Sequence, residues 1–156
     1  MSGPADKAAA RKLVLAARNG LSAADREGKS ALIQRRLCAW PPLVGCRAVM
    51  FYWAIGSEVR TDRAVEVVLQ SGKRVALPKT DVAGRRLLLS WVFDPARELV
   101  PGAYGIMEPG EATWKQAYPG ELELVVVPGV AYDPSGTRIG YGAGFYDRFF
   151  RELRGD

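Results

Sequence analysis

The chain has 156 residues, of which 48% are apolar and 25% are charged, as is ordinary for one globular domain with its own core. No apolar run reaches membrane-spanning length and the N-terminal segment lacks the apolar stretch of a secretory signal, so we expect a cytoplasmic protein without a membrane partner. The sequence contains no histidine, which excludes Ser-His-Asp and Cys-His catalysis, and its net charge of +5 favours anionic partners.

The first half of the chain predicts helices around one buried strand. Ser22 is a suitable N-cap for the second helix, and Pro41 follows that helix directly. The strand is short, apolar and rich in aromatic residues, and the helix after it stops at Gly72. The helices are expected at residues 5–18, 21–40 and 57–73, and the strand at residues 47–54.

The second half predicts mainly strands. Residues 94–119 are rich in proline and glycine and predict a long irregular connection. The apolar run within residues 121–133 is typical of a strand covered on both faces. The strands are expected at residues 74–78, 85–93 and 121–133. Helices alternating with strands predict an α/β fold: a single domain over residues 1–156 with a mostly parallel sheet flanked by helices, in an open, Rossmann-like arrangement.

A glycine-rich segment, RIGYGAGFYDRFF, occupies residues 138–150. By itself such a run indicates no more than a flexible turn. Here it follows a buried strand and opens a helix predicted from about Phe145, which is where α/β sheets bind phosphates. Glycines let backbone N–H groups approach an anion closely, and a helix N-terminus adds about half a positive charge. The segment therefore predicts a phosphate-binding loop.

This loop matches neither common nucleotide-binding fingerprint. A P-loop would end in Gly-Lys-Ser/Thr, and here Phe145 follows Gly144. A dinucleotide-binding fold would carry its glycines after the first strand, and here they follow the last predicted one. We therefore expect a phosphate loop of another type.

The segment VVVPGVAYDPSGTRIGYGAGFYDRFF resembles the 5-formyltetrahydrofolate cyclo-ligases, also called 5,10-methenyltetrahydrofolate synthetases. The match in order and spacing runs through Pro128, Gly129, Asp133, Gly136, Arg138, Gly140, Gly142, Gly144, Phe145, Tyr146 and Asp147. Weaker similarities lie earlier in the chain, in the order expected for the family, and extend the resemblance over essentially the whole chain. They are KAAAR with Lys7 and Arg11, WAIGSEVRT with Trp53 and Glu58, and PGAYGIMEP with Gly105, Ile106, Glu108 and Pro109.

The resemblance implies a ligase that converts 5-formyltetrahydrofolate, including polyglutamylated forms, to 5,10-methenyltetrahydrofolate with ATP and Mg²⁺. The formyl oxygen would take the γ-phosphoryl group, N10 would attack the activated carbon, and phosphate would leave. Such chemistry depends on positioning and charge neutralisation, so the absence of histidine is no obstacle.

The same resemblance implies the site residues, although it assigns no catalytic residue. ATP would be bound by Lys7, Arg11, Arg138, Ile139, Gly140, Tyr141, Gly142, Ala143, Gly144, Phe145 and Tyr146. The folate would be bound by Trp53, Glu58, Tyr141, Gly142, Ala143, Gly144 and Phe145. Asp147 would hold Mg²⁺, which prefers carboxylate oxygen. No role is implied for Glu108.

On the residues alone, simpler interpretations stay open. Lys7 and Arg11 are also typical of a solvated helix face, and Glu58 of the acidic start of a helix. Asp147 could serve only the dipole of its helix or pair with Arg151 one turn later.

Family members usually continue for several tens of residues beyond this helix, adding a strand and an acidic residue that shares the metal. We therefore expect a C-terminally short relative, and the alternative function is a non-catalytic nucleotide or folate binder. Nucleic-acid binding is a third class suggested by the basic charge, but no recognised reading helix or RNA motif supports a specific nucleic-acid partner. The oligomeric state is not indicated.

Overall fold

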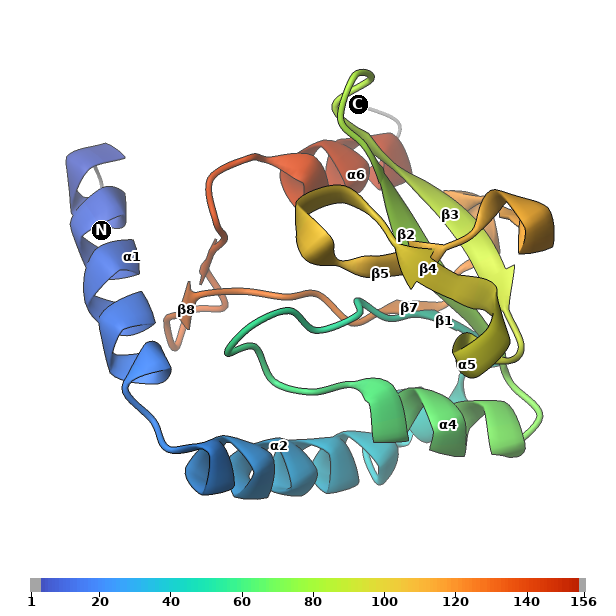
Figure 1. Ribbon diagram of the computed structural model, residues 1–156, viewed down its shortest axis with the longest axis horizontal. Helices are drawn as coiled ribbons and strands as arrows, with labels where there is room; N and C mark the ends of the chain where they lie inside the picture. Colours follow the sequence, from blue (N-terminus) through green and yellow to red (C-terminus); the bar gives the residue numbers. More distant parts are fainter. Residues whose placement is uncertain (1–3, 155–156) are drawn as a thin grey trace.

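The computed structural model describes residues 4–154 (Figure 1). Its helices are α1 (Pro4–Asn19), α2 (Ala23–Cys38), α3 (Pro41–Gly45), α4 (Asp62–Gln70), α5 (Pro95–Glu98) and α6 (Phe145–Arg154). Its strands are β1 (Ala48–Met50), β2 (Arg74–Asp81), β3 (Arg86–Val92), β4 (Leu99–Pro101), β5 (Met107–Pro109), β6 (Gln116–Ala117), β7 (Leu124–Val125), β8 (Ala131–Tyr132) and β9 (Arg138–Ile139). Short 3-10 turns lie at Ala103–Gly105, Glu111–Thr113 and Pro119–Glu121.

Within residues 4–154, a 5-stranded sheet has the order β6-β3-β2-β1-β7. β1 runs parallel to β2 and β7, whereas β3 is antiparallel to β2 and β6. The turn at residues 82–85 joins β2 to β3, and so short a connection links only antiparallel neighbours. The predicted α/β class is confirmed, and the parallel pairings lie around β1.

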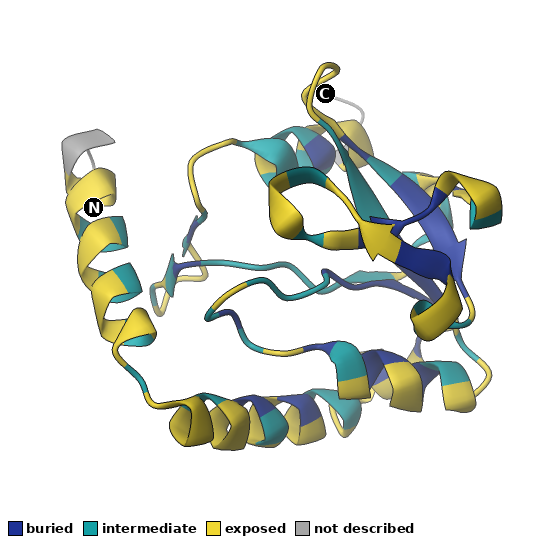
Figure 2. Ribbon diagram, in the orientation of Figure 1, coloured by how far each residue is buried: buried dark blue, intermediate teal, exposed yellow. Residues whose placement is uncertain are grey.

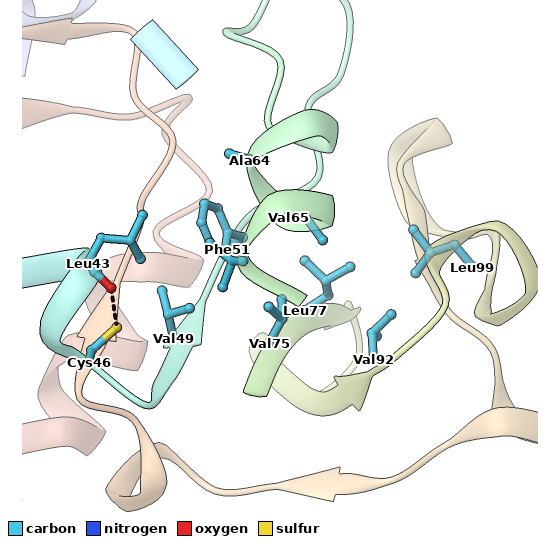
Figure 3. Close-up of a cluster of buried hydrophobic side chains, with 11 residues drawn as sticks. Leu43, Cys46, Val49, Phe51, Ala64, Val65, Val75, Leu77, Val92 and Leu99 are labelled. Atoms are coloured by element: carbon cyan, nitrogen blue, oxygen red, sulfur yellow. Dashed lines mark hydrogen bonds between the residues drawn. The ribbon is translucent and has the colours of Figure 1, made fainter. Parts of the chain in front are cut away.

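One face of the sheet is covered by α4. Val49 and Phe51 point to this face, as expected for alternate residues of a strand, and they pack with Val65 and Leu77 (Figure 3). α2 packs on α4, so both helices lie on the same side of the sheet (Figure 1). This apolar cluster fixes the strand β1, whose end leads into the site.

The opposite face is covered by α6. Ala48 and Met50 point to it, together with Leu89 and Trp91 of β3 and the fully buried Phe149 of α6. A buried aromatic side chain of this size contributes about 3–5 kcal/mol of stability when its cavity cannot collapse. Phe149 therefore anchors α6, and with it the glycine loop that leads into this helix.

Several elements differ in extent from the sequence prediction. α4 begins at Asp62 rather than near residue 57, and β1 ends at Met50, because residues 51–61 leave the sheet to form a wall of the site. The strand predicted over residues 121–133 is divided into β7 and β8, since Pro128 has no N–H to donate to a ladder. None of the helices within the described part of the chain is long and apolar enough to cross a membrane.

Candidate functional site

A pocket of about 470 Å³ lies where the parallel strands end. Tyr52 and Trp53 follow β1, Pro78 and Thr80 lie in the last part of β2, and Pro128 follows β7; all of them line the pocket. Open α/β sheets place their ligands at the carboxyl ends of parallel strands. The position and size of this pocket make it the candidate functional site.

The structure brings every predicted site residue to this pocket. They come from distant parts of the chain and are Lys7, Arg11, Trp53, Glu58, Arg138, Ile139, Gly140, Tyr141, Gly142, Ala143, Gly144, Phe145, Tyr146 and Asp147. The lining also contains residues to which the sequence analysis assigned no role. They are Tyr52, Ile55, Pro78, Thr80, Leu87, Tyr104, Ile106, Glu108 and Pro128.

The glycine loop turns its carbonyl groups toward arginines. The Gly140 carbonyl accepts a hydrogen bond from Arg11 Nε at 2.7 Å, and the Ala143 carbonyl accepts one from Arg148 Nη2 at 2.8 Å. Among the hydrogen bonds within residues 4–154, none uses a backbone N–H of residues 140–144 as donor. The N–H groups of the loop thus have no protein acceptor in the described part of the chain, as a backbone anion site requires.

Two glycines make this loop conformation possible. Gly142 has φ 107° and Gly144 has φ 72°, values that residues other than glycine rarely adopt. Helix α6 then begins at Phe145, so its positive N-terminal end lies directly beside the free N–H groups. Backbone donors and the helix dipole would therefore act together on an anion bound at the loop.

Helix α1 supplies further positive charge. Lys7 and Arg11 lie one turn apart on the helix and both line the pocket. Figure 2 shows that most of α1 is exposed, and none of its residues from 6 to 19 is buried. The helix is held chiefly through polar contacts rather than through an apolar core.

Arg18 makes most of those polar contacts. Its Nε donates to Ser57 Oγ at 3.0 Å and its Nη1 to the Gly129 carbonyl at 3.3 Å, while its Nη2 donates to the Tyr141 hydroxyl. A single guanidinium thus joins α1 to three segments around the pocket. The sequence carried a signal for it, since Arg18 lies seven residues after Arg11 on the same helical face.

Glu58 lies on the wall formed after β1. It is only 8% exposed, and its Oε2 accepts a hydrogen bond from the Ile55 N–H at 2.9 Å. Burial raises the pKa of Glu58, and the Ile55 N–H partly offsets this rise. Burial, together with the nearby Glu58, also raises the pKa of Tyr146, so this phenol stays protonated at neutral pH. The pocket therefore offers an acceptor on this wall, Glu58, and a donor on α6, Tyr146, among aromatic rings.

Arg138 and Asp147 form an ion pair at the edge of the pocket. Arg138 Nη2 lies 2.8 Å from Asp147 Oδ1, and Arg138 Nη1 donates to the Pro128 carbonyl at 3.0 Å. The Asp147 side chain is 68% exposed and so remains accessible to a ligand. Among the described residues, no three His, Cys, Asp or Glu side chains are grouped to hold a metal ion.

Glu108 has a structural position that its sequence motif did not reveal. It is 2% exposed, and its carboxylate accepts from the Thr80 N–H at 3.0 Å and from the Ala103 N–H at 3.3 Å. These bonds tie the end of β2 to the β4–β5 hairpin. The hairpin in turn places Tyr104, whose ring meets Phe145 edge to face with centroids 6.4 Å apart. Glu108 therefore lines the pocket and also holds the hairpin against the end of β2.

Fold and pocket define an α/β protein whose candidate ligand site lies at the ends of its parallel strands and is lined by the basic side chains of Lys7, Arg11 and Arg138. Comparison with known protein families identifies the group more closely. The chain belongs to the 5-formyltetrahydrofolate cyclo-ligase family, whose model matches residues 4–156.

Individual relatives agree with this assignment. The 5-formyltetrahydrofolate cyclo-ligase of Mycolicibacterium smegmatis is 34% identical over 147 residues, which cover 93% of this chain and 75% of that protein. The 5-formyltetrahydrofolate cyclo-ligase of Escherichia coli K12 is 33% identical over 114 residues, which cover 72% of this chain and 62% of that protein. The chain thus spans between about three fifths and three quarters of the length of these two relatives.

A solved structure is similar as well. The NMR structure of Aquifex aeolicus 5,10-methenyltetrahydrofolate synthetase superposes with a TM-score of 0.81 at 35% identity, covering 95% of this chain and 73% of that one. A 5,10-methenyltetrahydrofolate synthetase from Mycoplasma pneumoniae shares the fold with a TM-score of 0.71 at 23% identity, covering 95% and 79% of the two chains. The family and the fold are therefore shown independently by sequence and by structure.

Proposed function

We propose that this chain catalyses the ATP-dependent cyclisation of 5-formyltetrahydrofolate to 5,10-methenyltetrahydrofolate, with release of ADP and phosphate. Membership of the cyclo-ligase family supports this reaction. The observation that carries the proposal is the glycine loop, whose free N–H groups face no protein acceptor within residues 4–154 and whose residues line the pocket beside Lys7 and Arg11. Such a combination suits the phosphates of ATP.

In this proposal the loop and its cations bind and orient the triphosphate. The formyl oxygen attacks the γ-phosphorus and ADP leaves. N10 then attacks the formyl carbon and loses its proton, and the carbon–oxygen bond breaks to release phosphate. In both steps negative charge builds up on the leaving group, first ADP and then phosphate. Lys7, Arg11 and Arg138 line the pocket and would neutralise this charge, which is the main requirement of phosphoryl transfer.

The folate would lie against the wall formed after β1. Glu58 is a buried acceptor there, suited to the amino group and ring N–H of a pterin, and Trp53 offers a flat aromatic surface. Residues 141–145 would lie beneath the formyl end of the substrate, between the pterin and the nucleotide. The two ligands would then meet at the glycine loop.

Asp147 fits a role in holding Mg²⁺. Magnesium is commonly held by one or two carboxylates together with substrate phosphates, and Asp147 offers an accessible carboxylate at the end of the phosphate loop. When bound, Mg²⁺ would neutralise phosphate charge. Arg138 would keep the Asp147 carboxylate in place, since the two side chains are already paired.

We also infer that residues 1–156 act as one domain in the cytoplasm. Cys38 and Cys46 are both free thiols in the structure, as is typical of a reducing compartment. Apart from α1, the segments that line the pocket follow a strand of the central sheet or pack beside it.

The proposal is tested by incubating the protein with 5-formyltetrahydrofolate, ATP and Mg²⁺ and following the near-ultraviolet absorbance of the methenyl product. Product formation that requires both ATP and Mg²⁺ is expected. ATP binding without any product would instead identify a non-catalytic binder.

A further inference from the structure

Arg148 holds the glycine loop from outside the pocket. Its Nη2 donates to the Ala143 carbonyl at 2.8 Å, and its guanidinium carbon lies 5.2 Å from the centre of the Phe145 ring. Arg148 is not part of the pocket lining, whereas Ala143 and Phe145 are. Its contacts with the loop therefore lie on the side away from the ligand.

The bond to Ala143 decides where the next N–H points. The carbonyl of Ala143 and the N–H of Gly144 belong to one planar trans peptide, so they point in opposite directions. Because the carbonyl is turned to Arg148, the Gly144 N–H is turned away from Arg148. Gly144 lines the pocket, and its N–H donates to no protein acceptor within residues 4–154.

This peptide needs such a restraint. Gly142 and Gly144, on either side of Ala143, both have positive φ values. Glycines adopt many backbone conformations at similar energy, so the peptide between them is not fixed by local preference. The Arg148 side chain supplies a long-range restraint that the glycines lack.

Arg148 also contacts a segment that lies far from the loop in the sequence. Its Nε donates to the Arg85 carbonyl, in the turn between β2 and β3. That turn is closed by Asp81, which accepts from the Gly84 N–H at 2.8 Å and from Arg86 Nε at 3.1 Å. Arg148 thus connects the loop to a hairpin of the central sheet.

We propose that Arg148 is a positioning residue, which turns the peptide joining Ala143 and Gly144 so that its N–H serves the phosphate site. The proposal rests on the function proposed above for the loop. Arg148 acts without touching the ligand, through the geometry of two hydrogen bonds made by one planar guanidinium. A lysine ammonium has the same charge but cannot make both hydrogen bonds with the fixed geometry of a planar guanidinium.

The test compares Arg148→Gln and Arg148→Lys with wild type and with Arg151→Gln, a matched control. Arg151 is exposed, lies on the same helix and makes no ion pair within the described residues. ATP affinity is measured by calorimetry, loop order in the ligand-free protein by ¹⁵N relaxation of Gly142 and Gly144, and folding by the thermal midpoint. Both Arg148 variants are expected to bind ATP about tenfold more weakly and to show a more mobile loop, while Arg151→Gln matches wild type.

The outcomes separate this inference from the proposed function. Wild-type ATP affinity in folded Arg148→Gln would overturn the inference. Wild-type affinity in Arg148→Lys alone would also overturn it, because the positive charge rather than the paired hydrogen bonds of the guanidinium would then be responsible. If wild type binds no ATP, the proposed function fails. The ¹⁵N relaxation of the loop still tests Arg148 in that case. A more mobile loop in the Arg148 variants would support a positioning role, and unchanged relaxation in both variants would exclude it.

Discussion

Arg138 Nη2 lies 2.8 Å from Asp147 Oδ1, so the carboxylate proposed to hold Mg²⁺ is already paired with a guanidinium. The same guanidinium donates to the Pro128 carbonyl, and a Cβ atom at Gly140 would lie 2.9 Å from its Nη1. The pair is therefore built into the loop, and Asp147 is oriented before any ligand arrives.

We expect Asp147→Asn to weaken ATP binding roughly tenfold or more in the presence of Mg²⁺ and to change it little in EDTA. The asparagine keeps an acceptor for Arg138 but loses the negative charge that attracts the metal. Calorimetric titrations with and without Mg²⁺ measure the difference. An equal loss under both conditions would show that Asp147 acts only through Arg138.

Lys7→Ala is expected to weaken ATP binding about tenfold, because a cation facing the phosphates is removed. Lys12→Ala on the same helix is the control, since Lys12 is exposed and does not line the pocket. Both substitutions remove one charge and introduce the same helix-favouring residue. Equal affinities of the two variants would assign Lys7 to the solvated face of α1.

Glu58→Gln is expected to stabilise the protein at neutral pH. Burial raises the pKa of Glu58 in the folded state, so the fold favours the neutral carboxyl. The stability contributed by this group is therefore present below its unfolded pKa and is lost as pH rises through the folded value. Glutamine stays neutral, and its advantage over wild type in the free energy of unfolding should grow with pH.

Urea unfolding at several pH values between about 4 and 8 measures this advantage. The same variant should bind folate more weakly, because the charged acceptor for the pterin is lost. A stability advantage that does not depend on pH would contradict the explanation by burial of charge.

Two glycine substitutions are expected to have opposite signs. Gly142→Ala forces a side chain into a conformation with φ 107° and should cost about 1–3 kcal/mol, together with a loss of ATP affinity. Gly28→Ala lies in an exposed part of α2, where an added Cβ meets nothing within 4 Å, and should stabilise by about 1 kcal/mol. Denaturant unfolding of both variants checks the two signs.

Glu108→Ala should cost roughly 2–4 kcal/mol, because the Thr80 and Ala103 N–H groups lose their acceptor. Glu111→Ala is the control from the same segment, and its exposed pair with Lys79 should contribute at most about 1 kcal/mol. Thermal unfolding compares the stabilities of the two variants. A similarly small loss of stability in both would mean that water replaces the carboxylate of Glu108 as acceptor.

The sequence predicted the elements that follow local rules. Ser22 caps α2 as expected, its Oγ accepting from the Asp25 N–H at 3.0 Å, and Gly72 ends α4 with a positive φ. The glycine loop and the start of α6 were also placed correctly, because strand, loop and helix signals agree there.

What the sequence could not predict depends on long-range contacts. The region of residues 94–119 was expected to be irregular, yet it forms the β4–β5 hairpin, whose pairing is hidden by proline and glycine. Arg18, Tyr104 and Arg148 received no role, because their partners lie far away in the chain. Periodicity indicates which face of a helix is turned inward but not which carbonyl an arginine reaches.

The polar attachment of α1 has a thermodynamic consequence for ligand binding. A helix without buried side chains in residues 6–19 is expected to detach from the rest of the domain at a free energy well below that of global unfolding. Lys7 and Arg11 belong to this helix, so the measured affinity for a nucleotide includes the equilibrium between its detached and attached states. Amide exchange in α1 should therefore slow when nucleotide binds, and the N-terminal helix becomes part of the binding reaction itself.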